Sequence, residues 1–153
     1  DYYSGAPFFH KAMGQENVKY MMFAEWGVDV YSNALVATEK YIKDNPGLIK
    51  RFVKASLRGW EFTLKNPEEA IEIMAKHRPE IDKPILLANL KLIIDLFRTE
   101  RYKQNGIGWV DDKKMAESIK IISQYRDLKV DMKPGDLYTN EFLTKVPLPI
   151  AVK

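Results

Sequence analysis

The spacing of hydrophobic residues changes along this chain. Two short apolar runs, 18–23 and 33–38, lie near the N-terminus, and the first is rich in residues that favour β structure. From residue 39 onward, apolar side chains recur at steps of three and four, which is the period of an amphipathic helix. The pattern therefore predicts two strands early in the chain and helices after them.

Proline and glycine mark the ends of the predicted helices. A short helix is expected over 6–13, because Pro7 suits a first helical turn and Gly14 suits a helix end. Asn45-Pro46 and Asn66-Pro67 each place a capping side chain before a proline, so longer helices should start near 45 and 66. Comparable signals predict a helix over 82–99, a helix capped by Asp111 that runs through 122, and a turn at 134–136.

The two predicted strands need partners that this chain does not supply. A sheet of two strands is marginal in water, so 18–23 and 33–38 should pair with strands from elsewhere or with a second copy of the chain. We therefore expect an α/β protein, mostly helical with a few short strands, that forms part of a larger fold.

The amino-acid composition limits the kinds of functional site that this chain can contain. The 153 residues suit one domain, and the formal net charge is only +3. The chain contains no cysteine, which excludes disulfides, thiolate metal ligands and cysteine nucleophiles. His10 and His77 have no partner at metal-ligand spacing, so neither a metal site nor a catalytic residue is predicted. No apolar stretch is long enough to span a membrane, and we expect a soluble chain.

Basic residues gather on the stretch 40–58. Asp44 and Glu61 flank them, and no aromatic residues alternate with them at the spacing that single-stranded nucleic acid needs. We therefore expect no nucleic-acid partner. Two interpretations are open: a solvated helix face, or a basic surface that binds a partner.

Several motifs follow one another in an order that resembles a known family. They are 27–42 (GVDVYSNALVATEKYI), 45–46 (NP), 50–55 (KRFVKA), 59–60 (GW), 66–70 (NPEEA), 106–109 (GIGW) and 138–143 (YTNEFL). This order resembles the substrate-binding proteins of nitrate, sulfonate and thiamine-precursor ABC transporters. These share their fold, the type II periplasmic-binding-protein fold, with the thiamine-pyrimidine synthase. The resemblance is to the C-terminal half of such proteins.

The resemblance implies a two-lobed clamp that binds its ligand between the lobes. Residues 1–38 would end the second lobe and cross the hinge, and 39–153 would be the helical C-terminal part of the first lobe of a truncated chain. The implied function is to capture a pyrimidine or thiamine precursor, a sulfonate or a similar anion for a membrane permease. The implied location is periplasmic or extracellular, associated with the membrane through the transporter. We also expect a homodimer through exposed strand edges, and no cofactor.

The N-terminal segment supplies the first candidate ligand-binding residues. By resemblance, Tyr2, Tyr3 and Ser4 lie near the cleft. Tyrosine offers an aromatic face and a hydroxyl, and the helix start at Pro7 offers backbone donors, which together suit a flat or anionic ligand. The alternative is that the tyrosines only pack at a chain start.

Trp26, Asp29, Tyr31 and Asn33 surround the expected crossing between the lobes. An aromatic platform with a few aimed polar groups is typical of ligand sites, and Asp29 would suit a cationic or amine-bearing ligand. The alternatives are core packing for Trp26 and turn capping for Asp29 and Asn33.

Two further functions are weighed against solute binding. One is an enzyme like the thiamine-pyrimidine synthase, which by resemblance uses a cysteine-rich stretch and a histidine that reacts with a bound pyridoxal group. The lack of cysteine argues against it, and we expect no enzymatic activity. The other is a helical interaction or dimerisation domain with no small-molecule role.

Overall fold

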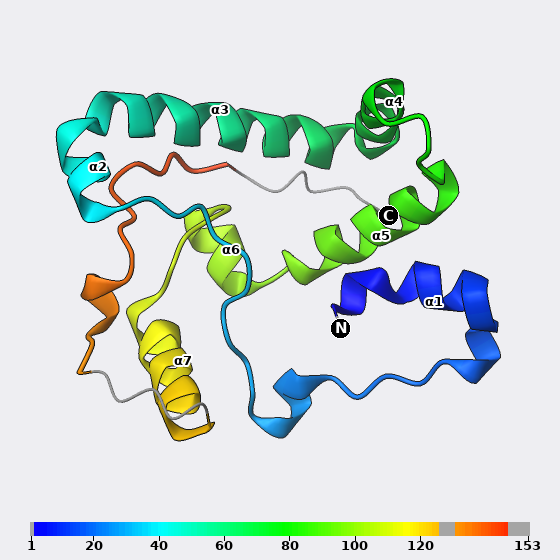
Figure 1. The fold of residues 1–153 in the computed structure, drawn as a ribbon, viewed down its shortest axis with the longest axis horizontal. Helices are drawn as coiled ribbons and strands as arrows, with labels where there is room; N and C mark the ends of the chain where they lie inside the picture. Colours follow the sequence, from blue (N-terminus) through cyan, green and yellow to red (C-terminus); the bar gives the residue numbers. More distant parts are fainter. Residues whose placement is uncertain (1, 126–130, 147–153) are drawn as a thin grey trace. The chain divides into compact units, whose positions relative to one another are not determined.

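Helices make up most of the computed structural model, which describes residues 2–125 and 131–146 (Figure 1). The α-helices are α1 (Ala6–Met13), α2 (Glu39–Asp44), α3 (Pro46–Lys65), α4 (Pro67–His77), α5 (Lys83–Leu96), α6 (Glu100–Asn105) and α7 (Asp112–Tyr125). Short 3-10 helices are η1 (Tyr3–Gly5), η2 (Gln15–Asn17), η3 (Phe23–Trp26) and η4 (Pro134–Asp136). The expectation of a mostly helical chain is confirmed.

The two predicted strands are absent from the part of the chain that the structure describes. Residues 18–22 and 33–38 belong to no helix or strand, although Val18, Met22 and Thr38 have extended backbone, and Phe23 opens η3. Leu35 and Val36 are 65% and 90% exposed. The few short strands were therefore a wrong prediction for these residues. The sequence favours extended backbone there, but a strand also needs hydrogen bonds from a neighbouring strand.

The helix boundaries agree with the predictions, whereas the capping roles of two asparagines do not. The Asn45 and Asn66 side chains donate to the carbonyls of Tyr41 and Phe62, so each closes the helix before it instead of capping the next one. Proline removes one backbone donor from the start of the next helix, which lowers the need for a side-chain cap. Asp111 does cap α7 as predicted, since its carboxylate accepts the Lys114 amide N–H at 2.9 Å.

The chain divides into two compact units. Unit 1 contains 1–20, 55–107 and 145–153, and unit 2 contains 21–54 and 108–144. These units are defined by contacts within this chain, whereas the lobes predicted to divide at residue 38 belong to a larger fold, and that division stays a prediction.

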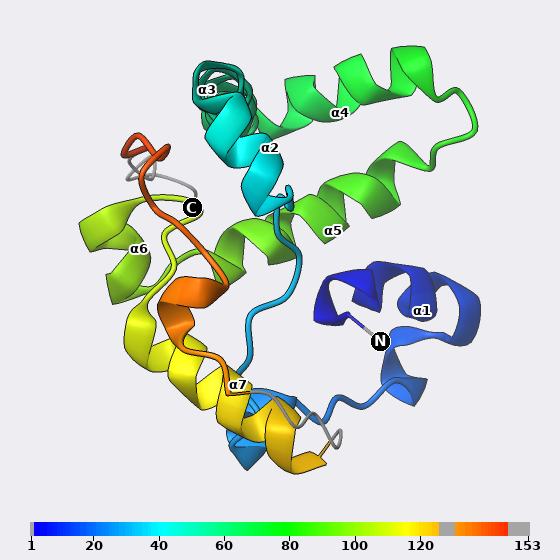
Figure 2. The same ribbon diagram turned by 60° about the vertical axis from the view of Figure 1, so that its left-hand side comes forward.

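Unit 1 is held together by apolar packing. Helix α4 lies against α5, and α1 and η1 pack on α5 (Figure 2). Leu64 and Ile94 are only 1% exposed. The rings of Trp60 and Phe97 meet edge to face at 5.3 Å, and Phe97 stacks on Tyr102 at 5.8 Å. Burial of a side chain such as Leu64 or Ile94 contributes about 1.5–3 kcal/mol to the free energy of unfolding, relative to leaving it exposed.

Gly106 of unit 1 sits where only glycine fits. Its φ is +87°, in the left-handed region that other residues rarely adopt. A Cβ atom at this position would also lie 2.9 Å from the backbone nitrogen of Val146. The close approach of 106 and 146 therefore depends on the missing side chain.

Unit 2 is held together by polar contacts. The Asn140 side chain accepts the Val110 N–H at 3.1 Å and donates to the Val110 carbonyl at 2.8 Å. The Tyr138 hydroxyl donates to Asp112 at 2.6 Å, which ties the chain near η4 to the first turn of α7. Among the described residues of this unit, Ser118 is the one that is buried, and it is polar.

Candidate functional site

The seven candidate residues fall into two groups. Tyr2, Tyr3 and Ser4 belong to unit 1, and Trp26, Asp29, Tyr31 and Asn33 belong to unit 2.

The N-terminal group takes part in local packing. The Tyr3 ring meets Tyr20 edge to face at 5.4 Å, and the Tyr20 hydroxyl bonds to the His10 imidazole Nε2. The Ser4 carbonyl accepts a hydrogen bond from Asn89 of α5 at 2.5 Å. These contacts fit the packing alternative, although Tyr2 leaves 62% of its surface exposed.

Asp29 and Tyr31 are tied to the first turn of α7. The Lys114 Nζ lies 2.5 Å from Asp29 Oδ1 and 5.2 Å from the centre of the Tyr31 ring. The Tyr31 hydroxyl accepts the Asp111 N–H at 2.9 Å. Asp29 therefore forms an ion pair instead of capping a turn, and the segment 29–31 has a defined position on α7.

A hollow of about 330 Å³ lies beside this pair. Its lining comes from the end of η3 and from one face of α7: Trp26, Gly27, Val28, Asp29, Glu117, Lys120, Ile121, Gln124 and Tyr125. Trp26 is 73% exposed, so core packing does not explain it. The structure thus brings Trp26 and Asp29 together in one lining. Tyr31 is linked to Asp29 through Lys114 but is not part of the lining, and Asn33 is exposed and also lies outside it.

The hollow offers an aromatic surface and charges of both signs. Trp26 and Tyr125, which is 70% exposed, supply ring faces. Asp29 and Glu117 supply carboxylates, and Lys120 supplies an ammonium group. Such a lining can stack a flat ring and exchange hydrogen bonds with its edge.

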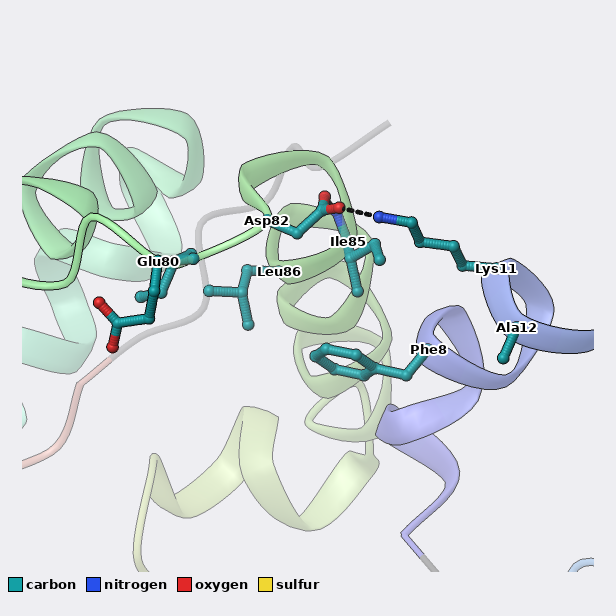
Figure 3. Close-up of a pocket in the computed structure, with 8 residues that line it drawn as sticks. Phe8, Lys11, Ala12, Glu80, Asp82, Ile85 and Leu86 are labelled. Atoms are coloured by element: carbon teal, nitrogen blue, oxygen red, sulfur yellow. Dashed lines mark hydrogen bonds and ion pairs between the residues drawn. The ribbon is translucent and has the colours of Figure 1, made fainter.

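A second, larger hollow lies in unit 1, between α1 and the start of α5 (Figure 3). It measures about 600 Å³ and is lined by Phe8, Lys11, Ala12, Glu80, Ile81, Asp82, Ile85 and Leu86. None of the seven candidates lines it. Its walls are mainly apolar, and in Figure 3 the side chains of Lys11 and Asp82 meet across its edge.

The charged groups of the larger hollow already have partners. Lys11 lies 2.5 Å from Asp82, and Asp82 also accepts the Ile85 N–H at 3.1 Å as the cap of α5. Both contacts lower the pKa of the Asp82 carboxyl, the Lys11 bond more strongly. We favour the hollow of unit 2 as the ligand site, because its aromatic rings are exposed and because Asp29, although paired with Lys114, leaves 64% of its side chain exposed.

The residues missed by the sequence analysis are Lys114, Glu117, Lys120 and Tyr125. Positions 114, 117, 120, 121, 124 and 125 recur at helical steps of three and four, so the sequence could have placed these residues on one helical face. It could not have shown that this face meets 26–29, because that contact joins segments about 85 residues apart.

Metal binding and membrane insertion have no support in the described part of the chain. Residues 2–125 and 131–146 contain no group of three His, Cys, Asp or Glu side chains able to hold a metal ion. Over the same residues, no helix is both long enough and apolar enough to cross a bilayer.

Comparison with known proteins connects the chain to small-molecule-binding proteins and to an enzyme. Over 115 residues it is 29% identical to the riboflavin-binding protein RibY of Chloroflexus aurantiacus, a match that covers 73% of this chain and 33% of RibY. It is 25% identical over 71 residues to the formylaminopyrimidine-binding protein of Halalkalibacterium halodurans, covering 46% of this chain and 22% of that protein.

The enzyme among these relatives is the 4-amino-5-hydroxymethyl-2-methylpyrimidine phosphate synthase of Legionella pneumophila. It is 26% identical over 102 residues, covering 67% of this chain and 30% of the synthase. The matches thus span a third or less of the length of these curated relatives. The family model described as NMT1/THI5 like matches residues 2–70. The family predicted from the sequence motifs is therefore confirmed: residues 2–70 are NMT1/THI5 like, and the similarity to RibY extends beyond them.

Proposed function

We propose that this chain is part of a solute-binding protein that captures a small organic ligand containing a flat heterocyclic ring. Two relatives are named for ligands of this kind, a flavin and a formylaminopyrimidine. In the whole protein, the ligand would be held between two lobes of a type II periplasmic-binding-protein fold and passed to a membrane permease. The protein would then act in the periplasm or outside the cell.

The observation that carries this proposal is the hollow beside α7. Trp26 and Asp29, both chosen from the sequence as ligand-binding residues, line one hollow of about 330 Å³ together with Tyr125 and Lys120. A flat ring could stack on the exposed indole of Trp26 while Asp29 accepts hydrogen bonds from its N–H groups.

Binding to Trp26 can be tested by NMR with riboflavin and with 4-amino-2-methylpyrimidine. The chain has three tryptophans, so its indole N–H groups give three signals, and Trp26→Phe assigns one of them. We expect weak binding, with a dissociation constant of about 1 mM, because an open hollow excludes little water. Trp26→Ala removes this reporter, so binding to both variants is followed on the NMR signals of the ligand; Trp26→Ala should weaken binding about tenfold, the loss of one stacking contact.

Phe23→Ala is the matched control. Phe23 lies in the same 3-10 helix, is 66% exposed and does not line the hollow, so its loss should leave binding unchanged. If neither compound shifts the Trp26 signal, or if both variants behave alike, the proposed site is wrong.

The second candidate function is that of a synthase, because the chain is similar to the Legionella enzyme over 67% of its length. This enzyme class would form a covalent chromophore with pyridoxal phosphate. Incubation with pyridoxal phosphate should give no stable absorbance band on the wild-type chain. An absorbance band that persists after dialysis would support the synthase, because a stable imine with pyridoxal phosphate requires a lysine amine held in a cofactor site.

A further inference from the structure

Lys114 holds its ammonium group between two of the candidate ligand residues. Its Nζ lies 2.5 Å from Asp29 Oδ1 and 5.2 Å from the centre of the Tyr31 ring. The Lys114 side chain is only 16% exposed, whereas that of Asp29 is 64% exposed. The cation is therefore largely covered, and the carboxylate that it neutralises is still open to a ligand.

The position of Lys114 is set by its own helix. Its N–H donates to the Asp111 carboxylate at 2.9 Å, and its carbonyl accepts the Ser118 hydroxyl at 2.9 Å. Asp111 in turn donates its N–H to Tyr31. Neither Lys114 nor Tyr31 needs a bound ligand to keep this arrangement.

The charges around the hollow balance only when Lys114 is included. Asp29 and Glu117 in the lining are negative and Lys120 is positive, which leaves one excess negative charge. The ammonium group of Lys114, in contact with Asp29, cancels that excess. A cationic ring would therefore gain little from Asp29, because the attraction is offset by repulsion from Lys114 at a similar distance.

We propose that Lys114 is a specificity-determining residue: by neutralising Asp29, it makes the hollow prefer an uncharged flat ring with N–H donors over a cationic ring of the same shape. This inference rests on the proposed function. It also revises the interpretation drawn from the sequence, in which Asp29 suited a cationic ligand. Lys114 acts through Asp29 and is a positioning residue for it.

The test compares two probes that differ in charge. The neutral probe is 4-amino-2-methylpyrimidine in its unprotonated form, and the cationic probe is its N1-methylated pyrimidinium salt. Binding to the 153-residue chain is measured from the Trp26 indole signal, at low ionic strength so that screening does not hide the effect. The measured quantity is the ratio of the two dissociation constants.

The wild-type chain should bind the neutral probe more tightly. Lys114→Met keeps the apolar stem but removes the charge, and it should shift the ratio toward the cation by about tenfold. Lys114→Arg should keep the wild-type ratio. The double variant Lys114→Met with Asp29→Asn restores the charge balance and should return the ratio close to that of the wild type.

The outcomes separate this inference from the proposed function. If the wild-type chain binds neither probe, the proposed function fails and this inference fails with it. If both probes bind but Lys114→Met leaves their ratio unchanged, this inference alone is overturned. A Lys114→Met shift that the double variant does not reverse would also overturn it, since the effect would then be structural and not due to Asp29.

Discussion

The two units of this chain are stabilised by different interactions. Every buried hydrophobic residue in the described part of the chain belongs to unit 1, where α1, α4 and α5 pack together. Unit 2 relies on hydrogen bonds and an ion pair that join its segments to α7. The core of unit 1 is thus apolar, whereas in unit 2 polar contacts join the segments and Trp26 is 73% exposed, where it can meet a ligand.

The largest effect should come from the core of unit 1. Leu64→Ala removes a side chain that is 1% exposed and should lower the free energy of unfolding by about 2–5 kcal/mol. Leu48→Ala is the control, because Leu48 lies on the same helix and is 43% exposed. Urea unfolding measures both. Equal costs would mean that apolar burial does not distinguish unit 1.

A smaller, local effect is expected in unit 2. Asn140→Ala removes both hydrogen bonds to Val110 and should cost about 1–3 kcal/mol. Hydrogen exchange at the Val110 amide should become faster, while that at Ile94 in unit 1 should not change. Asn33→Ala, at an exposed position, provides the control. Unchanged exchange at Val110 would argue against polar contacts as the basis of unit 2.

The smallest expected effect is a change of folding stability with pH. The hydrogen bond to Asp112 raises the pKa of Tyr138 to about 12, above the usual value of 10. Because the folded chain holds this proton more tightly, the bond stabilises the fold below pH 10, and its contribution is lost as the pH rises from about 10 to 12. Tyr138→Phe should flatten this part of the stability curve. Absorbance at alkaline pH that showed every tyrosine ionising near 10 would contradict the assignment.

The sequence by itself determined most of the helices and pointed to the similarity with the NMT1/THI5-like family. Proline and glycine placed the helix ends, and the ordered motifs pointed to the family that matches 2–70. The helix ends, and each motif taken singly, depend on residues close together in the chain, where local backbone preferences dominate. The sequence also selected Trp26 and Asp29, which line one hollow, as well as Tyr31 and Asn33, which lie outside its lining.

Only the tertiary structure decided which distant residues meet. It left 18–22 and 33–38 unpaired, because strand formation requires hydrogen bonds from another segment. It also placed Lys114 on Asp29, about 85 positions away, and so changed the charge that a ligand would encounter. Such a pairing depends on how the chain folds back on itself, which neither residue type nor spacing encodes locally.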